Sequence, residues 1–280
     1  MTESASIMRF KAQIRNYAKA YAVPAQTAMQ NFMFERFLLR LSKSRFREKL
    51  VIKGGFLISA IVGLPKRTTM DIDTTLRGMP LDEAGLADTI NEICATGDDG
   101  ISFILRKIEP IRHDDLYGGF RLSMSAELET TSTPFTIDVS AGDAITPAPV
   151  EFDYRSRFDD TSFTISAYTI ETVLAEKAEA ILTLGTLSTR PRDYYDIKVI
   201  SDICDVDVTR FSDALVATAK HRGTLSQICG WRKTIEGLLV DDGLNRQWKK
   251  YQNRFPYAGN IGFPVCVAAL RKLMDKVDFG

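Results

Sequence analysis

The first part of the chain has apolar positions that repeat at helical spacing. From Phe32 to Leu41 the apolar side chains recur every three or four residues with charged residues between them, which predicts helices over the first fifty residues. A short apolar run at 50–53 then predicts a strand, which leads into Gly54-Gly55. The apolar stretch 56–62 after these glycines predicts a helix, so this part of the chain is expected to form a strand, a tight turn and a helix.

The middle of the chain has the pattern of strands. Residues 71–76 and 101–108 are rich in β-forming side chains, and a helix is expected between them over 81–94. Residues 120–128 alternate strictly between apolar and polar side chains, which is typical of a strand with one buried face. Residues 135–139 predict a further short strand. We therefore expect these strands to form one sheet.

A loop and a change of pattern follow the strands. The segment 142–160 contains glycine, proline and many polar residues, which predicts a loop and a candidate boundary. From Thr169 onward the pattern is helical; Thr169 suits an N-cap, and Pro191 suits the first turn of a second helix. The predicted fold class is α+β, a mixed sheet with flanking helices and a helical C-terminal region. The predicted parts are an N-terminal helical segment over 1–48, a core over 49–165 and a helical domain over 166–280.

Charge is distributed unevenly, although the formal net charge of the 280 residues is zero. Residues 1–53 contain eleven Lys or Arg against three acids, and residues 220–280 contain eleven against five. The middle of the chain is correspondingly acidic. This distribution is compatible with an enzyme that holds metal ions centrally and a polyanion at its edges. Solvated charged faces of ordinary helices would give the same counts, so both explanations stay open.

Other features of the composition exclude several classes of protein. Only two histidines are present, and the four cysteines lie far apart with no CxxC pair, which argues against a zinc site or a disulfide framework. No stretch approaches the roughly 20 apolar residues that a membrane helix needs. The first ten residues lack the pattern of a secretion signal. We expect a cytoplasmic protein without a membrane partner.

The sharpest chemical feature is the motif Asp71-Ile72-Asp73. Positions i and i+2 of a strand point to the same face, so both carboxylates can reach one point. Two such anions repel each other unless something positive lies between them, and Mg²⁺ prefers oxygen ligands of this kind. A third acid, Asp138, on the strand 135–139 would complete a two-metal site for phosphoryl transfer. Two solvated acids at a strand end and a turn-forming Asp138 are the alternatives.

Other residues around these acids suit a bound phosphate. Gly54-Gly55 stand before a helix, where backbone N–H groups and the helix dipole favour an anion. Thr69 shares the strand face of Asp71 and is able to bond a phosphate oxygen or a ligand carboxylate, and Arg67 is able to clamp the same phosphates. Both residue types are also common in turns before strands.

Several motifs in order resemble one known family. Lys53-Gly54-Gly55, the segment from Arg67 to Asp73, Ile137-Asp138-Val139 with Gly142-Asp143, Glu176-Lys177 and the segment from Arg190 to Asp196 follow one another over more than half of the chain. Together they resemble the AbiEii family of nucleotidyltransferase toxins, which includes the mycobacterial MenT enzymes. That family is part of the superfamily of DNA polymerase beta. The resemblance implies a nucleotidyltransferase-type mixed sheet with flanking helices.

The resemblance also implies roles for single residues. Asp71 and Asp73 match the family's metal-binding pair, and Asp138 matches the acid on the following core strand. Lys177 matches the lysine expected to touch the nucleotide's phosphates. Asp193 matches the acid of the late motif and Arg190 the basic residue before it, with Arg192 in the place of a frequent lysine. The implied nucleotide-binding residues are Lys53, Gly54, Gly55, Arg67, Thr69, Lys177 and Arg190.

Without the family, these later residues have structural explanations. Lys177 lies near an apolar helical stripe and could extend to solvent. Asp193 and Asp196 share a helix face, so they could form an ion-pair cluster at the start of that helix. Phe211, Leu238, Trp248 and Phe263 in the C-terminal helices are most simply core residues.

The expected reaction is transfer of a nucleoside monophosphate from an NTP to an acceptor with Mg²⁺ or Mn²⁺ as cofactor. The resemblance implies an RNA acceptor, the 3′ end of tRNA, a toxin role, and a cognate antitoxin. One alternative is transfer to a protein or to a small-molecule hydroxyl. Another is a catalytically silent module that binds a nucleotide or RNA.

Overall fold

The computed structural model describes residues 3–97, 99–111 and 118–279. The chain forms two compact units. The first comprises residues 1–142 and 150–167, and the second comprises residues 143–149 and 168–280. The N-terminal helices belong to the first unit. Each unit is described by itself below.

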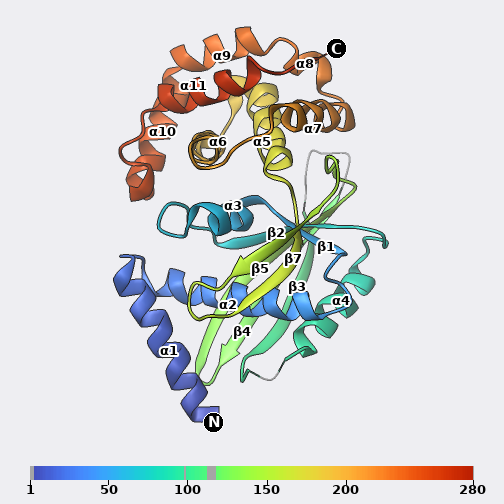
Figure 1. The fold of residues 1–280 in the computed structure, drawn as a ribbon, viewed down its shortest axis with the longest axis vertical. Helices are drawn as coiled ribbons and strands as arrows, with labels where there is room; N and C mark the ends of the chain where they lie inside the picture. The colour runs from blue at the N-terminus through green and yellow to red at the C-terminus, as the bar shows by residue number, and fades with distance from the viewer. Residues whose placement is uncertain (1–2, 98, 112–117, 280) are drawn as a thin grey trace. The chain divides into compact units, whose positions relative to one another are not determined.

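The first unit is built on one mixed sheet of seven strands among the described residues, in the order β3-β4-β5-β2-β1-β7-β6 (Figure 1). The central strands β2 and β5 are parallel to each other, and β1 is antiparallel to β2 and parallel to β7. The two edges of the sheet are antiparallel hairpins. The strands are β1 (Leu50–Lys53), β2 (Asp71–Leu76), β3 (Ser102–Ile111), β4 (Gly119–Leu128), β5 (Thr131–Ala141), β6 (Val150–Arg155) and β7 (Ser162–Ala167).

Helix α2 provides the main packing partner of this sheet within the unit. Phe34 and Phe37 of α2 are buried, and their rings lie 5.5 and 6.2 Å from the ring of Phe135 on β5. Phe103 of β3 and Phe56 of α3 complete this aromatic cluster. The helices of the unit are α1 (Glu3–Ala20), α2 (Ala25–Lys43), α3 (Gly54–Val62) and α4 (Glu83–Ala95).

The sheet separates an apolar face from a polar one at its centre. Ile72 of β2 and Ile137 of β5 are direct partners, and both are fully buried. Successive side chains on a strand point to opposite faces. Asp71 and Asp73, on either side of Ile72, and Asp138, directly after Ile137, therefore project from the other face. The alternation predicted for 120–128 is confirmed only in part. Leu122, Met124, Ala126 and Leu128 are buried, but Phe120 is only partly buried, and Ser125 on the polar face is buried as well.

Two predictions about the strands were wrong. The segment 142–160 is not a loop throughout, because β6 occupies Val150–Arg155 and pairs with β7. The prolines at 147 and 149 precede this strand rather than interrupt it, and its position at the sheet edge leaves four of its six side chains exposed. The strand predicted over 135–139 is longer in the structure, from Thr131 to Ala141, because β4 and, from Thr136 onward, β2 pair with it.

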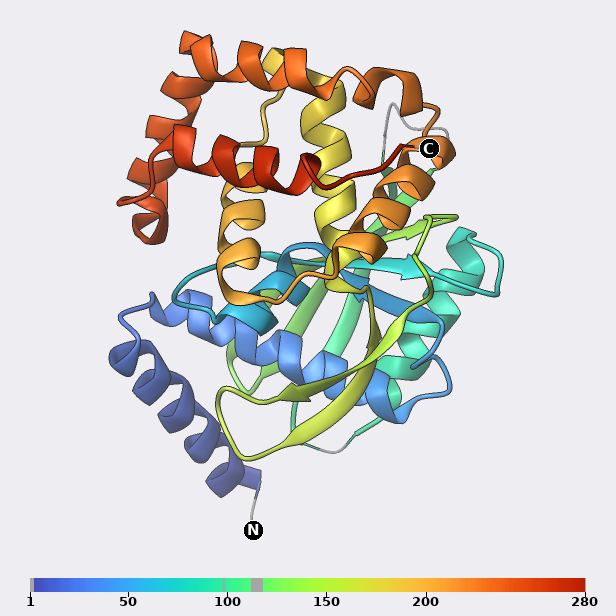
Figure 2. The same ribbon diagram turned by 45° about the horizontal axis from the view of Figure 1, so that its top comes forward.

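The second unit consists of helices. Thr169 caps α5 through a hydrogen bond that its Oγ1 accepts from the Thr172 N–H at 3.1 Å, and Pro191 begins α6, as predicted. Helix α5 packs on α7, and α6 packs on α11 (Figure 2). The predicted core residues Phe211, Leu238, Trp248 and Phe263 are buried. The helices are α5 (Ile170–Leu184), α6 (Pro191–Ile203), α7 (Val208–His221), α8 (Leu225–Ile228), α9 (Trp231–Val240), α10 (Asp242–Arg254) and α11 (Phe263–Met274), with 3-10 turns at Gly185–Leu187 and Pro256–Ala258.

The predicted α+β architecture of a mixed sheet, flanking helices and a helical C-terminal region is confirmed. Within the described ranges, no helix combines the length and the apolar character that crossing a membrane requires.

Candidate active site

A row of four charged side chains crosses the centre of the sheet. Lys53 of β1 is the strand partner of Asp73 of β2, Asp73 is the partner of Asp138 of β5, and Asp138 is the partner of Arg121 of β4. Directly opposite residues point to the same face of a sheet, with their Cβ atoms about 5 Å apart. The register therefore gathers two acids and two bases along one line, with the acids in the middle.

Asp71 is next to this row on the same face. It begins β2, and its carboxylate accepts a hydrogen bond from Thr69 Oγ1 at 2.8 Å. The same hydroxyl lies 3.2 Å from the Asp71 carbonyl oxygen. Thr69 is fully buried. Its predicted place beside Asp71 is thus the observed one, and its hydroxyl is already bonded to this carboxylate.

Asp73 has an environment that disfavours its charge. Burial of the carboxyl and the negative charge of Asp71 raise the pKa of Asp73 from the usual 3.8 to about 6. The Gly55 N–H, which donates to Asp73 Oδ2 at 3.1 Å, and the Lys53 ammonium both act in the opposite direction. The raised pKa shows that burial of Asp73 and the charge of Asp71 together outweigh the effects of the Gly55 N–H and the Lys53 ammonium.

The Gly54-Gly55 turn approaches these acids closely. Gly54 has a φ of +60°, which glycine adopts without strain, and Gly55 lies in the first turn of α3. A Cβ on Gly55 would lie 2.8 Å from Thr69 Oγ1 and 3.1 Å from an Arg67 guanidinium nitrogen. A side chain at position 55 would meet Thr69 and Arg67, which occupy that space.

Arg67 lies beneath this turn. Its side chain is 2% exposed, and it donates to the Thr68 carbonyl oxygen at 2.5 Å. The expected clamp between Arg67 and a phosphate stays a prediction. The guanidinium is buried, and it bonds the backbone carbonyl of the adjacent Thr68.

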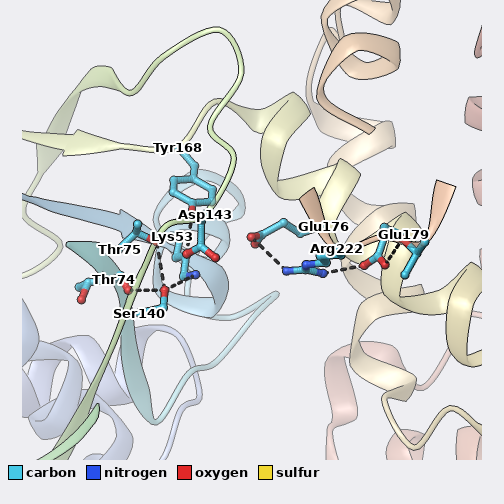
Figure 3. Close-up of polar contacts among 10 residues, drawn as sticks. Lys53, Thr74, Thr75, Ser140, Asp143, Tyr168, Glu176, Glu179 and Arg222 are labelled. Carbon is cyan, nitrogen blue, oxygen red and sulfur yellow. Dashed lines mark hydrogen bonds and ion pairs between the residues drawn. The ribbon is translucent and has the colours of Figure 1, made fainter. Parts of the chain in front are cut away.

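Lys53 reaches along the sheet to β5. Its Nζ donates to Ser140 Oγ at 2.8 Å, and that hydroxyl also lies 3.2 Å from Thr75 Oγ1 and 3.3 Å from the Thr74 carbonyl oxygen (Figure 3). Ser140 is two residues beyond Asp138 and shares its face. These bonds hold the Lys53 ammonium near the acids, where it lowers the pKa of Asp73.

Arg121 holds the third acid. Its Nε and one terminal nitrogen donate to the two oxygens of Asp138 at 2.8 and 2.6 Å, which is the bidentate geometry of a guanidinium and a carboxylate. The Arg121 side chain is 49% exposed, and that of Asp138 is 18% exposed. The hydrogen bonds to Asp138 raise the pKa of Arg121 further above its usual range. Arg121 was not expected at the site, because the alternation of β4 shows only that it is on the polar face. Its partner depends on which strand lies alongside and in which register.

The second unit carries the other predicted residues. Lys177 of α5 donates to Asp193 Oδ1 at 2.5 Å and lies 2.9 Å from an oxygen of Asp196, both on α6. Asp196 is fully buried, whereas Arg190 before α6 is exposed. The predicted Lys177 and Asp193 are thus brought together, and Asp196 joins them. The alternative of a structural ion-pair cluster at the start of α6 also fits these contacts.

Further polar contacts in the second unit involve motif residues (Figure 3). Tyr168 donates to Asp143 at 3.2 Å. Arg222, directly after α7, lies 3.4 Å from Glu176 and donates to the buried Glu179 at 2.6 Å, and Thr224 donates to Glu179 at 2.8 Å. Glu176, which precedes Lys177, therefore contacts the arginine that follows α7.

The donor set of the first unit fits a divalent cation in part. Asp71 and Asp73 supply carboxylate oxygens from one strand face, and a cation between them would relieve the repulsion that raises the pKa of Asp73. Asp138 fits only when its carboxylate leaves Arg121. Within the part of the chain that the structure describes, no three acidic, histidine or cysteine side chains converge closely enough to hold a metal ion.

Comparisons with known proteins identify the family. No curated protein matches the chain. Four chains among solved structures match. Two of these are crystal structures from Helicobacter pylori, one of a candidate nucleotidyltransferase and one of the protein JHP933. Each is 15% identical to this chain with a TM-score of 0.47 and covers 90% of it, and the matches span 98% and 95% of their own lengths.

A family model described as nucleotidyl transferase AbiEii toxin, type IV TA system, matches residues 36–273. This range includes every residue predicted for the site and most of both units. The family expected from the motifs is confirmed, and with it the class of enzyme, a nucleotidyltransferase. The chain belongs to the AbiEii family, the nucleotidyl transferase toxins of type IV toxin–antitoxin systems.

Proposed function

We propose that this protein transfers a nucleoside monophosphate from an NTP to an RNA acceptor, the 3′ end of tRNA, with Mg²⁺ or Mn²⁺ as cofactor. Membership of the AbiEii family supports nucleotidyl transfer and the toxin role. The observation that carries the proposal is the row across the sheet, in which Asp73 and Asp138 are strand partners and Asp71 shares their face. Such an arrangement of acids suits phosphoryl transfer.

In this proposal the acids hold the cation. Asp71, Asp73 and Asp138 are the metal ligands, and the cation supplies charge stabilisation at the triphosphate and at the attacking hydroxyl. The N-terminus of α3 at Gly54-Gly55 binds phosphate oxygens through its backbone N–H groups. Lys53 is suited to this role because its ammonium already lies near the acids. Thr69 positions Asp71 through its hydrogen bond.

The residues of the second unit take their roles from the family. Lys177 contacts the nucleotide's phosphates, Asp193 orients Lys177 through their ion pair, and Arg190 adds an exposed positive charge for an anionic substrate. The buried Arg67 supports the turn and adds positive charge beneath it.

The choice of an RNA acceptor rests on the resemblance to the AbiEii family. Residues 1–53 and 220–280 each carry an excess of Lys and Arg, which is compatible with a polyanion without requiring one. NTPs and tRNA are present together in the cytoplasm, so we propose that location. A type IV toxin has a cognate antitoxin, and we propose that its protein partner is encoded beside it.

The proposal is tested with purified protein, Mg²⁺, total tRNA and each of the four labelled NTPs in turn. We expect label on tRNA with wild-type protein and none with Asp71→Ala. Asp88→Ala, on an exposed position of α4, is the matched control and should transfer label like the wild type. The same assay with EDTA in place of Mg²⁺ should give no label.

Other outcomes select the alternatives. Label that appears only on protein or on a small hydroxyl compound rejects the RNA acceptor. Binding of an NTP without label on any acceptor, unchanged in Asp73→Asn, identifies a module that binds without catalysis. Transfer to tRNA that persists in Asp71→Ala would reject the assignment of the metal site.

A further inference from the structure

The Arg121–Asp138 pair differs from the contacts of the other two acids. Asp71 accepts a hydrogen bond from a neutral hydroxyl, and Asp73 accepts one from a backbone N–H. Asp138 has both oxygens engaged by a guanidinium from the adjacent strand. Of the three acids, Asp138 is thus the one with both oxygens bonded to a positively charged side chain of the protein.

This pair has a geometric consequence for the site. The two strands place Arg121 and Asp138 directly opposite each other, so the guanidinium reaches the carboxylate without leaving the polar face. Arg121 is on β4, on one side of Asp138, whereas Asp73 is on the other side, on β2. A cation bound by Asp71 and Asp73 therefore competes with Arg121 for the oxygens of Asp138.

The pair is suited to an exchange of partners. The Arg121 side chain is half exposed, so water can solvate its guanidinium when it separates from Asp138. A guanidinium presents a planar fork of donors that fits a phosphate as well as a carboxylate. Arg121 is thus able to bond another oxyanion in place of Asp138.

We propose that Arg121 exchanges partners during the reaction cycle: it neutralises Asp138 before substrate binds, and it bonds a substrate phosphate when Asp138 turns toward the cation. This inference rests on the proposed function, in which Asp138 is a metal ligand. Arg121 is then a positioning residue for Asp138 and a phosphate-binding residue in the substrate complex. The phosphate belongs either to the NTP or to the RNA acceptor, and these two sources are distinguished by binding measurements.

The test compares Arg121→Ala and Arg121→Lys with the wild type. The matched control is Arg106→Ala, because Arg106 is an exposed arginine on the same hairpin and pairs with Glu127 at 2.9 Å, away from the acids. The first measurement is Mn²⁺ binding without nucleotide. The electron paramagnetic resonance signal of free Mn²⁺ is used to detect this binding. The second is the dissociation constant of each NTP and of total tRNA in the presence of Mg²⁺. Thermal melting shows whether each variant is folded.

We expect Arg121→Ala to bind Mn²⁺ about two- to fivefold more tightly, because a competing cation has been removed from Asp138. The same variant should bind either NTP or tRNA about tenfold more weakly, because a charge-assisted bidentate contact is lost. Arg121→Lys should lie between the wild type and Arg121→Ala in both measurements, and Arg106→Ala should match the wild type. A residue that only supports the fold would weaken both kinds of binding together.

Unchanged Mn²⁺ affinity in Arg121→Ala overturns the proposal, and so does unchanged affinity for both NTP and tRNA. If Arg121→Ala does not fold, the same criteria apply to Arg121→Lys. Label transfer by the wild type combined with unchanged Mn²⁺ affinity in the variants rejects this inference and leaves the proposed function standing. Tighter Mn²⁺ binding and weaker NTP binding without any label transfer to tRNA support the exchange and reject the proposed acceptor.

Discussion

The Asp73 carboxylate occupies the space into which a side chain on Gly54 would project. A Cβ on Gly54 would lie 2.0 Å from Asp73 Oδ2 and 2.6 Å from its carboxyl carbon. Gly54 also has a φ of +60°, which other residues rarely adopt. Two independent constraints therefore require glycine at position 54, directly after β1. One is the backbone conformation, and the other is the position of a predicted catalytic acid.

Gly54→Ala should therefore displace Asp73 and disturb the site. We expect a loss of about 2–4 kcal/mol in the free energy of unfolding, because strain at a positive φ and a steric clash act together. Label transfer to the acceptor should fall to background. Urea denaturation and the NTP transfer assay measure the two effects.

Gly223→Ala separates the two causes. Gly223 has a similar φ of +67°, but a Cβ there would meet nothing within 4 Å. This variant should lose only about 1–2 kcal/mol, the cost of the backbone conformation alone. Equal losses in the two variants would show that Asp73 does not approach Gly54 as closely as described.

Gly55→Ser tests whether this turn has room for a side chain. The new side chain would meet Thr69 and Arg67, both buried, so we expect lower stability and lower activity rather than a gain in phosphate binding. Thr69→Ala in the Gly55→Ser background should recover part of the lost stability, because it removes the atom 2.8 Å from the new Cβ. A double-mutant cycle by urea denaturation measures this coupling. Additive losses would count against the steric explanation.

The sequence is sufficient to predict the elements around Asp71 and Asp73. The strand before Gly54, the helix after it and the strand that begins at Asp71 all follow from short apolar runs between clear turn signals. The alternation over 120–128 likewise predicts that Leu122, Met124, Ala126 and Leu128 are buried, because one face of that strand packs on the core. These features depend on local sequence, which is why they were predictable.

The partners of the acids could not be predicted in the same way. That Arg121 lies opposite Asp138, and Lys53 opposite Asp73, depends on the strand order and on a register fixed by pairing between distant segments. The edge strand β6 was missed because two prolines come before it and the segment was interpreted as a loop, although Val150, Phe152 and Tyr154 alternate with charged residues as in a half-buried strand. Asp196 was expected only as part of an ion-pair cluster with Asp193, because two acids three residues apart share a helix face, and its full burial has no signal in the sequence.

Asp73→Asn should stabilise the protein at neutral pH while it abolishes activity. The folded-state pKa of Asp73, about 6, is above its usual value of 3.8, so the folded protein holds this proton more tightly than the unfolded chain. Stability from this group is therefore present below about pH 4 and is lost as the pH rises through about 6. The difference of about two pKa units corresponds to at most about 3 kcal/mol.

The measurement is urea denaturation of Asp73→Asn and wild type at pH 7.5 and pH 4.5 without divalent cations. The variant should be more stable at pH 7.5, and the advantage should shrink at pH 4.5, where the wild-type carboxyl is protonated. Asp88→Asn on the exposed face of α4 is the control and should show no such change. An advantage that grows as the pH falls would contradict the direction of the pKa shift.

A structural role and a catalytic role of Lys177 lead to different predictions, and variants within the second unit alone can test them. Its ammonium lies between Asp193 and the fully buried Asp196. Lys177→Met removes the ammonium that pairs with this buried acid, so we expect a loss of about 3–5 kcal/mol in stability as well as a loss of activity. Adding Asp196→Asn removes the charge that Lys177 neutralises, and the double variant should recover most of the stability. If it folds like the wild type and transfers no label, Lys177 acts on the substrate. If transfer returns with stability, the role of Lys177 is limited to the ion pairs with α6.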